Sequence, residues 1–361
     1  MNNLKLQKID KKKILFLNLE TFSNTGGIQN YNKMLLKALD LSDYNTISVS
    51  IYDDQDIKDE FSNIKIYNFN KHKIRATLFI LRNFKKIDKV ILTHINLIPV
   101  ALLLKILNPN INFYLCIYGI EAWKKLSFFY RLFFIFKKIK ILSVSNYTTN
   151  MFMKFNNIKK ELFFYLPPPI SINPQKKVVN PYKEKEYNIL SISRLDDNYK
   201  GIDTMINTLP FLVNSIPNIK YTVIGNGINK KKLEELAYNL NVSKYIDFKG
   251  FIEELTPFYK YCDVFVLPSK GEGFGIVYLE AMSYKKPCIG CNAGGVTDVI
   301  VDNATGFLCG YDDVKCLAKK ILLLYKDRNL SIKFGNNGYR RVIENFTFEK
   351  FQERLKNILD N

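Results

Sequence analysis

Cysteine and histidine are scarce in this 361-residue sequence, which has six of the first and two of the second. The cysteines form no CxxC pair, and none lies at metal-ligand spacing with a histidine, which argues against a Cys/His metal site. Most of the cysteines sit in apolar, strand-like runs. We therefore expect all six to be buried free thiols in a reducing compartment.

Long apolar runs are also missing. The longest uncharged stretch, residues 90–104, is interrupted by polar residues. It falls short of the roughly 20 residues that a helix needs to cross a bilayer. The first 20 residues are basic but contain no signal-type apolar segment. These absences predict a cytoplasmic protein without a transmembrane helix.

Acidic residues are few in the first half of the chain. Residues 1–180 hold 28 Lys and Arg against 12 Asp and Glu, so most of the total charge of +19 lies there. Nucleic acid, an anionic membrane surface and a phosphorylated acceptor all fit such a field, and composition leaves the three open. The hydrophobic content of 47% suits two ordinary domains.

Short β-branched and aromatic runs alternate with helix-period segments along the chain, which is typical of βα units and a parallel sheet. The pattern pauses over residues 166–186, which include five prolines, and then resumes. The sequence thus predicts an α/β fold of two Rossmann-like, doubly wound domains facing each other across a cleft. The expected parts are an N-terminal domain (1–168), a linker (169–186), a C-terminal domain (187–345) and a C-terminal helix (346–361) that is capped by Thr347 and packs back on the first domain.

The most informative segment is PSKGEGFGIVYLEAMSYKKP, residues 268–287, which follows an apolar strand and opens a helix. Its glycines let the backbone approach a ligand closely, and a helix start presents N–H groups to an anion. Glu272 and Glu280 are separated by seven residues, a pattern that resembles the retaining glycosyltransferases of family 4. An ordinary glycine-rich turn is the structural alternative.

Two cations follow the first predicted strand of the second domain in the segment ISRLDDNYKG. Arg194 and Lys200 lie there just before Gly201, and such cations at a strand end suit a pyrophosphate. The resemblance implies that they neutralise the departing nucleoside diphosphate, whereas a solvated basic loop is the alternative. Gly225, in a second glycine turn, corresponds to a position that passes near the nucleotide.

The first domain has looser matches. Gly26 and Gly27 lie between the first strand and the first helix, where the family closes over the donor phosphates, although a helix cap by Thr25 explains them equally well. His94 ends a predicted strand. In the segment YGIEAW, Tyr118 stands where the family commonly has a histidine, and Glu121 either faces the acceptor or caps the next helix.

The resemblance spans about residues 14–358. It implies the GT-B fold and transfer of a hexose from a nucleoside-diphosphate sugar, such as a UDP-sugar or GDP-mannose, to a glycan or lipid-linked acceptor with retention. It implies no cofactor and no metal. The implied catalytic residues are Arg194, Lys200, Glu272 and His94. The implied donor-binding residues are Gly26, Gly27, Tyr118, Gly225, Gly273, Phe274, Gly275, Ile276, Val277 and Glu280, with Glu121 on the acceptor side.

Three alternative functions fit the sequence to different degrees. A nucleotide-sugar 2-epimerase clamps the same diphosphate on the same fold and stays open. A nucleic-acid-binding protein would use the basic first half, but the basic residues line no known reading motif, so no nucleic acid is expected. A dinucleotide oxidoreductase is disfavoured because no GxGxxG follows the first strand.

The segment KKLSFFYRLFFIFKKIK, residues 124–140, combines an aromatic centre with flanking lysines. This composition is typical of a helix that lies in a membrane interface rather than across it. Packing of its phenylalanines on the sheet is the alternative. We expect the segment to form such a helix and to dock the protein on the inner face of an anionic membrane.

Overall fold

The structure is a computed structural model that describes residues 12–24, 26–54, 61–84, 87–171, 177–196 and 199–361. The chain divides by its contacts into an N-terminal unit (Met1–Val144, Thr148–Pro168 and Phe351–Asn361) and a C-terminal unit (Ser145–Tyr147 and Pro169–Lys350). Three predictions fall outside the described residues: the absence of a signal segment in 1–11, the cap by Thr25 and the part of the linker at 172–176.

The N-terminal unit is built on a parallel sheet whose described strands run in the order β3-β2-β1-β4-β5-β6-β7. The order reverses between β1 and β4, so the carboxyl ends of these neighbours form the switch point where ligands bind in such sheets. The strands are β1 (Lys13–Asn18), β2 (Asn45–Ser50), β3 (Lys65–Asn68), β4 (Lys89–Leu92), β5 (Asn112–Ile117), β6 (Ile139–Ser143) and β7 (Phe163–Tyr165).

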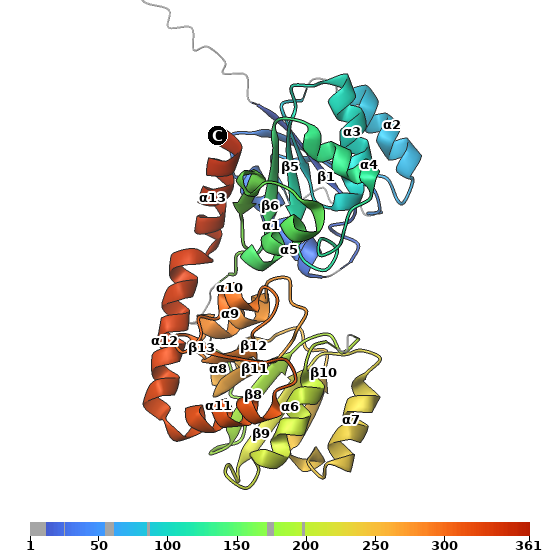
Figure 1. Cartoon of the computed structure of the whole chain (residues 1–361). Helices are drawn as coiled ribbons and strands as arrows, with labels where there is room; N and C mark the ends of the chain where they lie inside the picture. Colours follow the sequence, from blue (N-terminus) through green and yellow to red (C-terminus); the bar gives the residue numbers. More distant parts are fainter. Residues whose placement is uncertain (1–11, 25, 55–60, 85–86, 172–176, 197–198) are drawn as a thin grey trace, which may run out of the picture. The chain divides into compact units, whose positions relative to one another are not determined.

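Helices cover both faces of this sheet (Figure 1). One face packs on α2, α3 and α5, which contribute Ile80, Leu104 and Phe152 to a continuous core. The other face meets α1 and α13. The bounds are α1 (Gly27–Asp40), α2 (Lys73–Asn83), η1 (Ile95–Leu97), α3 (Ile98–Leu107), α4 (Phe128–Arg131), η2 (Leu132–Ile135), α5 (Asn146–Asn156), η3 (Lys160–Leu162) and α13 (Phe348–Asp360).

The last helix, α13, lies against the first sheet. The side chain of Thr347 accepts a bond from the backbone N of Lys350 at 3.4 Å, so the expected cap is present. At the other end, Lys140 donates to the carbonyl of Ile358 at 2.8 Å, and Lys89 donates to that of Leu359. The last carbonyls of a helix lack partners within the helix, so these two lysines satisfy them.

The C-terminal unit repeats the same architecture, with a described strand order of β10-β9-β8-β11-β12-β13 and parallel pairing throughout. Its strands are β8 (Tyr187–Ile192), β9 (Ile219–Ile224), β10 (Ile246–Gly250), β11 (Val264–Leu267), β12 (Cys288–Cys291) and β13 (Gly306–Cys309). The switch point lies between β8 and β11. The prediction of two doubly wound, Rossmann-like sheets is confirmed.

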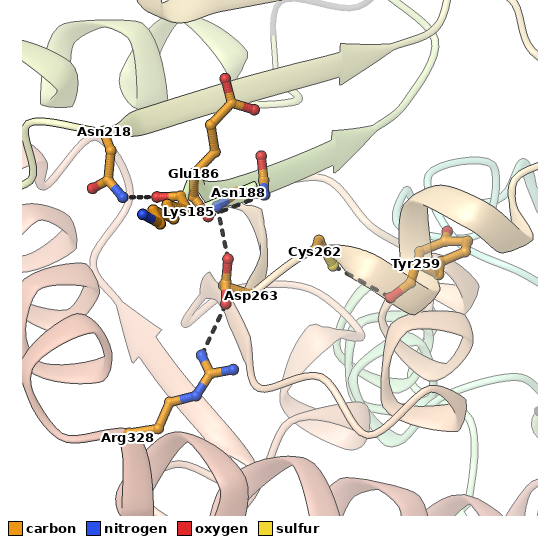
Figure 2. A network of polar contacts seen from close by, with 8 residues as sticks. All are labelled: Lys185, Glu186, Asn188, Asn218, Tyr259, Cys262, Asp263 and Arg328. Atoms are coloured by element: carbon orange, nitrogen blue, oxygen red, sulfur yellow. Dashed lines mark hydrogen bonds and ion pairs between the residues drawn. The ribbon is translucent and has the colours of Figure 1, made fainter. Parts of the chain in front are cut away.

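The helices of this unit follow the strands in turn. They are α6 (Ile202–Thr208), η4 (Leu209–Phe211), α7 (Lys230–Asn239), η5 (Ser243–Tyr245), α8 (Thr256–Tyr261), α9 (Ile276–Ser283), α10 (Val296–Val299), α11 (Val314–Lys326) and α12 (Arg328–Asn345). A polar network fastens α12 to the amino ends of β8 and β11 (Figure 2). In it, Asp263 accepts from the backbone N of Asn188 and from Arg328, each at 2.8 Å.

The structure contradicts the prediction of six free thiols. Cys309, at the end of β13, forms a disulfide with Cys316 in the first turn of α11, where the two Cα atoms lie 5.9 Å apart. This separation suits a disulfide. The other four cysteines are free and buried, as expected.

The prediction of one helix over residues 124–140 is also wrong. The segment forms the single turn of α4, then η2, and it enters β6 at Ile139. A helix cannot continue there because Ile139 and the residues that follow pair with β5. Among the described residues, no helix is long and apolar enough to cross a membrane.

Candidate functional site

Two predicted charged residues meet at the switch point of the second sheet. Lys200 lies in the loop after β8 and Glu272 in the loop after β11, and β8 and β11 are paired neighbours. The Nζ atom of Lys200 lies 2.8 Å from Oε1 of Glu272, and the two side chains are only 14% and 15% exposed. Arg194 follows the end of β8, and its side chain is exposed.

Glycines hold these loops together. Gly201 has a φ of +75°, and a Cβ atom there would lie 2.4 Å from the carbonyl oxygen of Pro268. The backbone N of Gly295 donates to the carbonyl of Glu272 at 2.7 Å, and a Cβ on Gly295 would lie 2.1 Å from the oxygen of Gly273. Any side chain at these positions displaces the loop that carries Glu272.

The start of α9 follows directly after Glu272. Gly275 caps the helix with a φ of +101°, and Phe274 is buried against the ring of Phe346 with centroids 5.7 Å apart. Ile276 and Val277 form the partly buried first turn. The first backbone N–H groups of an α-helix have no carbonyl partner within it, so this turn suits an anion.

Glu280 lies one turn further along α9. Its Oε2 atom accepts a hydrogen bond of 2.6 Å from the hydroxyl of Tyr259 in α8. Burial raises the pKa of the Glu280 carboxyl, and the bond from Tyr259 lowers it. Tyr259 was not singled out from the sequence, because nothing local to α8 reveals a partner 21 residues away.

Gly225 has a structural reason for its identity. It adopts a φ of +138°, and a Cβ atom there would lie 1.8 Å from the carbonyl oxygen of Ser193. The backbone of β9 therefore runs tightly past the residue that precedes Arg194. Gly225 supports the end of β8, which positions Arg194.

The remaining predicted residues lie in the N-terminal unit, where His94 follows β4. Its Nδ1 atom accepts from the backbone N of Asn96 at 3.0 Å, so the proton of the neutral ring is on Nε2. Burial and, to a smaller extent, Lys124 lower the pKa of His94, while Glu121 raises it and the net shift is downward. At neutral pH His94 is thus an uncharged donor.

Tyr118 and Glu121 form the turn after β5. The Oε1 atom of Glu121 accepts from the backbone N of Tyr118 at 2.7 Å and of Gly119 at 3.0 Å, so it holds this turn and does not cap the next helix. The hydroxyl of Tyr118 donates to the amide oxygen of Asn32 at 3.0 Å inside the core. The structure therefore directs the phenol of Tyr118 inward.

Gly26 and Gly27 begin α1, and no side chain of a described residue caps this helix. The loop before them is held by Asp53, a fully buried carboxylate that sequence reasoning missed. Asp53 accepts 2.9 Å bonds from the backbone N of Thr21, Phe22 and Ser23. In the sequence it is one of five acids within residues 53–60, and only the fold distinguishes it from the others.

Comparison with known protein families gives one match, which lies in the second unit. The family described as glycosyl transferases group 1 matches residues 173–341, which include every predicted residue of the second unit. Within the described residues, no group of three or more His, Cys, Asp or Glu side chains is placed to hold a metal.

Two curated relatives cover different shares of the chain. The capsular polysaccharide biosynthesis glycosyltransferase CapM of Staphylococcus aureus is 32% identical over 160 residues, 44% of this chain and 42% of CapM, so the match spans less than half of that relative. An uncharacterized glycosyltransferase of Methanocaldococcus jannaschii is 28% identical over 342 residues, 90% of this chain and 92% of the relative.

The fold matches a solved structure along nearly its whole length. HepE of Anabaena, crystallised in complex with UDP, superposes with a TM-score of 0.79 at 16% identity over 96% of this chain and 99% of HepE. At this identity the likeness shows the fold alone. Residues 173–341 thus belong to the glycosyl transferases group 1 family, known as GT4, and the chain as a whole has the GT-B fold.

Proposed function

We propose that this chain transfers a hexose from a nucleoside-diphosphate sugar to an acceptor hydroxyl with retention at the anomeric carbon, using the loops after β8 and β11. The observation that carries this proposal is the ion pair between Lys200 and Glu272. It holds a cation suited to phosphate beside a carboxylate suited to sugar hydroxyls. The glycine contacts of Gly201 and Gly295 fix both loops.

In the proposed reaction, positively charged groups stabilise the leaving diphosphate. The bond between sugar and phosphate breaks with a growth of negative charge on the diphosphate, which Arg194 and Lys200 neutralise. The N–H groups of Phe274, Gly275 and Ile276 add the partial charge of a helix start. The leaving phosphate itself takes the proton of the acceptor hydroxyl, so no carboxylate is required as a base.

The carboxylates and His94 orient the donor. Glu272 binds hydroxyls of the transferred sugar and Glu280 binds those of the ribose. His94, an uncharged Nε2–H donor, binds a further oxygen of the sugar. Glu121 supports this region by holding the turn after β5 rather than by meeting the acceptor.

We propose a surface polysaccharide, a lipopolysaccharide or a glycolipid as the product. The support is the relation to CapM, whose name places it in capsular polysaccharide biosynthesis. The basic first half of the chain also favours an anionic, lipid-linked acceptor.

The test is a panel of UDP-, GDP-, ADP- and dTDP-sugars incubated with the purified protein. A member that raises the melting temperature and is slowly hydrolysed or transferred supports the proposal. Release of an epimerised sugar without any acceptor would instead identify a 2-epimerase. A panel in which no nucleotide sugar binds overturns the proposal.

We further propose that the N-terminal unit docks on an anionic membrane through the docking segment, residues 124–138. Although the segment is not one helix, its centre exposes large apolar side chains: Phe128 is 72% and Ile135 76% exposed, while Phe133 between them is fully buried. Lys124, Lys125, Lys137 and Lys138 are exposed around them. Apolar area with flanking cations is what an anionic bilayer surface attracts.

A groove of about 610 Å³ beside η2 adds to this picture. Phe128, Leu132 and Ile158 form part of its apolar wall, and Arg131 also lines it. The Nε atom of Arg131 is buried and makes no hydrogen bond among the described residues. Because the guanidinium of Arg131 lines this groove, it suits an anionic partner such as a lipid phosphate.

Co-sedimentation with vesicles tests this second proposal. Wild type should pellet with anionic vesicles, release as salt rises and ignore neutral ones. Glutamate at the four exposed lysines should abolish pelleting, with Lys140 left intact because it holds α13. The matched control replaces four exposed lysines of the C-terminal unit, Lys231, Lys232, Lys244 and Lys249. If both variants lose vesicle binding to the same extent, the binding depends only on net charge, and residues 124–138 are not a docking segment.

A further inference from the structure

A buried tyrosine hydroxyl donates a hydrogen bond to Glu280, one of the two glutamates of the site. Tyr259 belongs to α8, its side chain is 2% exposed, and its hydroxyl donates to Oε2 of Glu280 at 2.6 Å. Burial and the nearby carboxylate of Glu280 raise the pKa of the Tyr259 phenol well above its usual value. The hydroxyl therefore stays protonated and remains a donor at every working pH.

The structure keeps this donor in one place. The ring of Tyr259 stacks on that of Tyr284 with an interplanar angle of 2° and centroids 6.1 Å apart. A second contact holds the end of α8, where the thiol of Cys262 donates to the carbonyl oxygen of Tyr259 at 3.5 Å (Figure 2). The next residue, Asp263, ties the chain to β8 and to Arg328. Tyr259 has little freedom to leave Glu280.

We infer that Tyr259 is a positioning residue for the nucleotide: it holds the Glu280 carboxylate ionised and aimed at the ribose hydroxyls. The inference rests on the proposed function of this site. A carboxylate that accepts one fixed hydrogen bond on Oε2 keeps Oε1 for a second partner. An ionised carboxylate also binds hydroxyl donors more strongly than a neutral acid does.

The variant Tyr259→Phe removes the hydroxyl and keeps the ring. Calorimetric titration with UDP and GDP should show affinity about tenfold lower than wild type. The loss should disappear with the 2′,3′-dideoxy form of the tighter diphosphate, which has no ribose hydroxyls to bind. Tyr284→Phe is the matched control, because its hydroxyl bonds to Thr256 at 3.3 Å and not to Glu280.

The pH dependence separates positioning from packing. The bond from Tyr259 lowers the pKa of Glu280, so its removal raises that pKa further. Affinity falls when Glu280 takes up a proton, and in Tyr259→Phe this fall should begin at a higher pH than in wild type. In a Glu280→Gln background, Tyr259→Phe should change affinity less than about twofold.

Several outcomes overturn the inference alone: a Tyr259→Phe protein that binds like wild type, an equal loss with the dideoxy ligand, or fully additive effects in the double variant. A wild-type protein that binds neither UDP nor GDP overturns the proposed function, and this inference with it.

Discussion

Lys200 and Glu272 form an ion pair of 2.8 Å across the loops that follow two neighbouring strands of the second sheet. Each carries a charge that the proposed reaction uses on the donor, and in this structure each neutralises the other. The ion pair therefore holds both side chains in place, and neither partly buried charge is left unpaired. A nucleotide sugar would enter between partners that are already in place.

The first prediction concerns the cations. Lys200→Ala and Arg194→Ala should each lower kcat about a hundredfold, which corresponds to about 3 kcal/mol of transition-state stabilisation, while the fold persists. Lys249→Ala removes an exposed cation elsewhere in the same unit and should leave kcat unchanged. Steady-state kinetics on the donor identified by the panel would measure this, and wild-type kcat in either site variant would contradict the proposed role of that cation.

A second prediction concerns the glycine contacts. Gly295→Ala should weaken donor binding by tenfold or more, because a Cβ atom 2.1 Å from the oxygen of Gly273 pushes the Glu272 loop aside. At Gly310 an added Cβ would meet its nearest neighbour at 3.6 Å, an ordinary contact, so Gly310→Ala serves as control. Binding isotherms that are equal for the two variants would refute the packing argument.

These loops are the part of the site that sequence predicts best. Each loop is a short local motif of glycines and charges after a strand, so it is recognisable in the sequence even though Lys200 and Glu272 lie 72 residues apart. Asp53 and Tyr259 belong to no such motif, and their partners lie 30 to 32 and 21 residues away. Lone acids and tyrosines have no sequence signature.

The docking segment shows a second limit on what the sequence predicts. Its apolar and basic composition predicts an interfacial helix, but pairing of Ile139 with Phe113 in the sheet ends any helix before that point. Phe113 and Ile139 are far apart in the sequence, so the composition of the segment does not reveal that they pair. The disulfide between Cys309 and Cys316 was also not predicted, because its formation depends on where β13 ends and α11 begins.

The third prediction concerns stability. Asp53→Ala should lower the free energy of unfolding of the N-terminal unit by about 2 kcal/mol or more, since it leaves the backbone N–H groups of Thr21, Phe22 and Ser23 without their acceptor. Asp54→Ala, at the exposed neighbour, should cost far less. Urea denaturation followed by circular dichroism compares them, and equal midpoints would argue against a structural role for Asp53.

A fourth prediction is that transfer continues in excess chelator. In the proposed reaction, Arg194, Lys200 and the start of α9 supply the positive charge that the diphosphate needs. Activity measured with EDTA should match activity measured with Mg²⁺. Loss of transfer in EDTA that Mg²⁺ or Mn²⁺ restores would contradict the proposed charge arrangement.

The most direct measurement is the proton NMR spectrum of the anomeric centre while the protein consumes its preferred nucleotide sugar. The account predicts that an α-linked donor yields an α-linked product or, by slow hydrolysis, the α-sugar first, and that Lys200→Ala suppresses the signal. A β-configured first product, or undiminished turnover in Lys200→Ala, would contradict retaining transfer at this site.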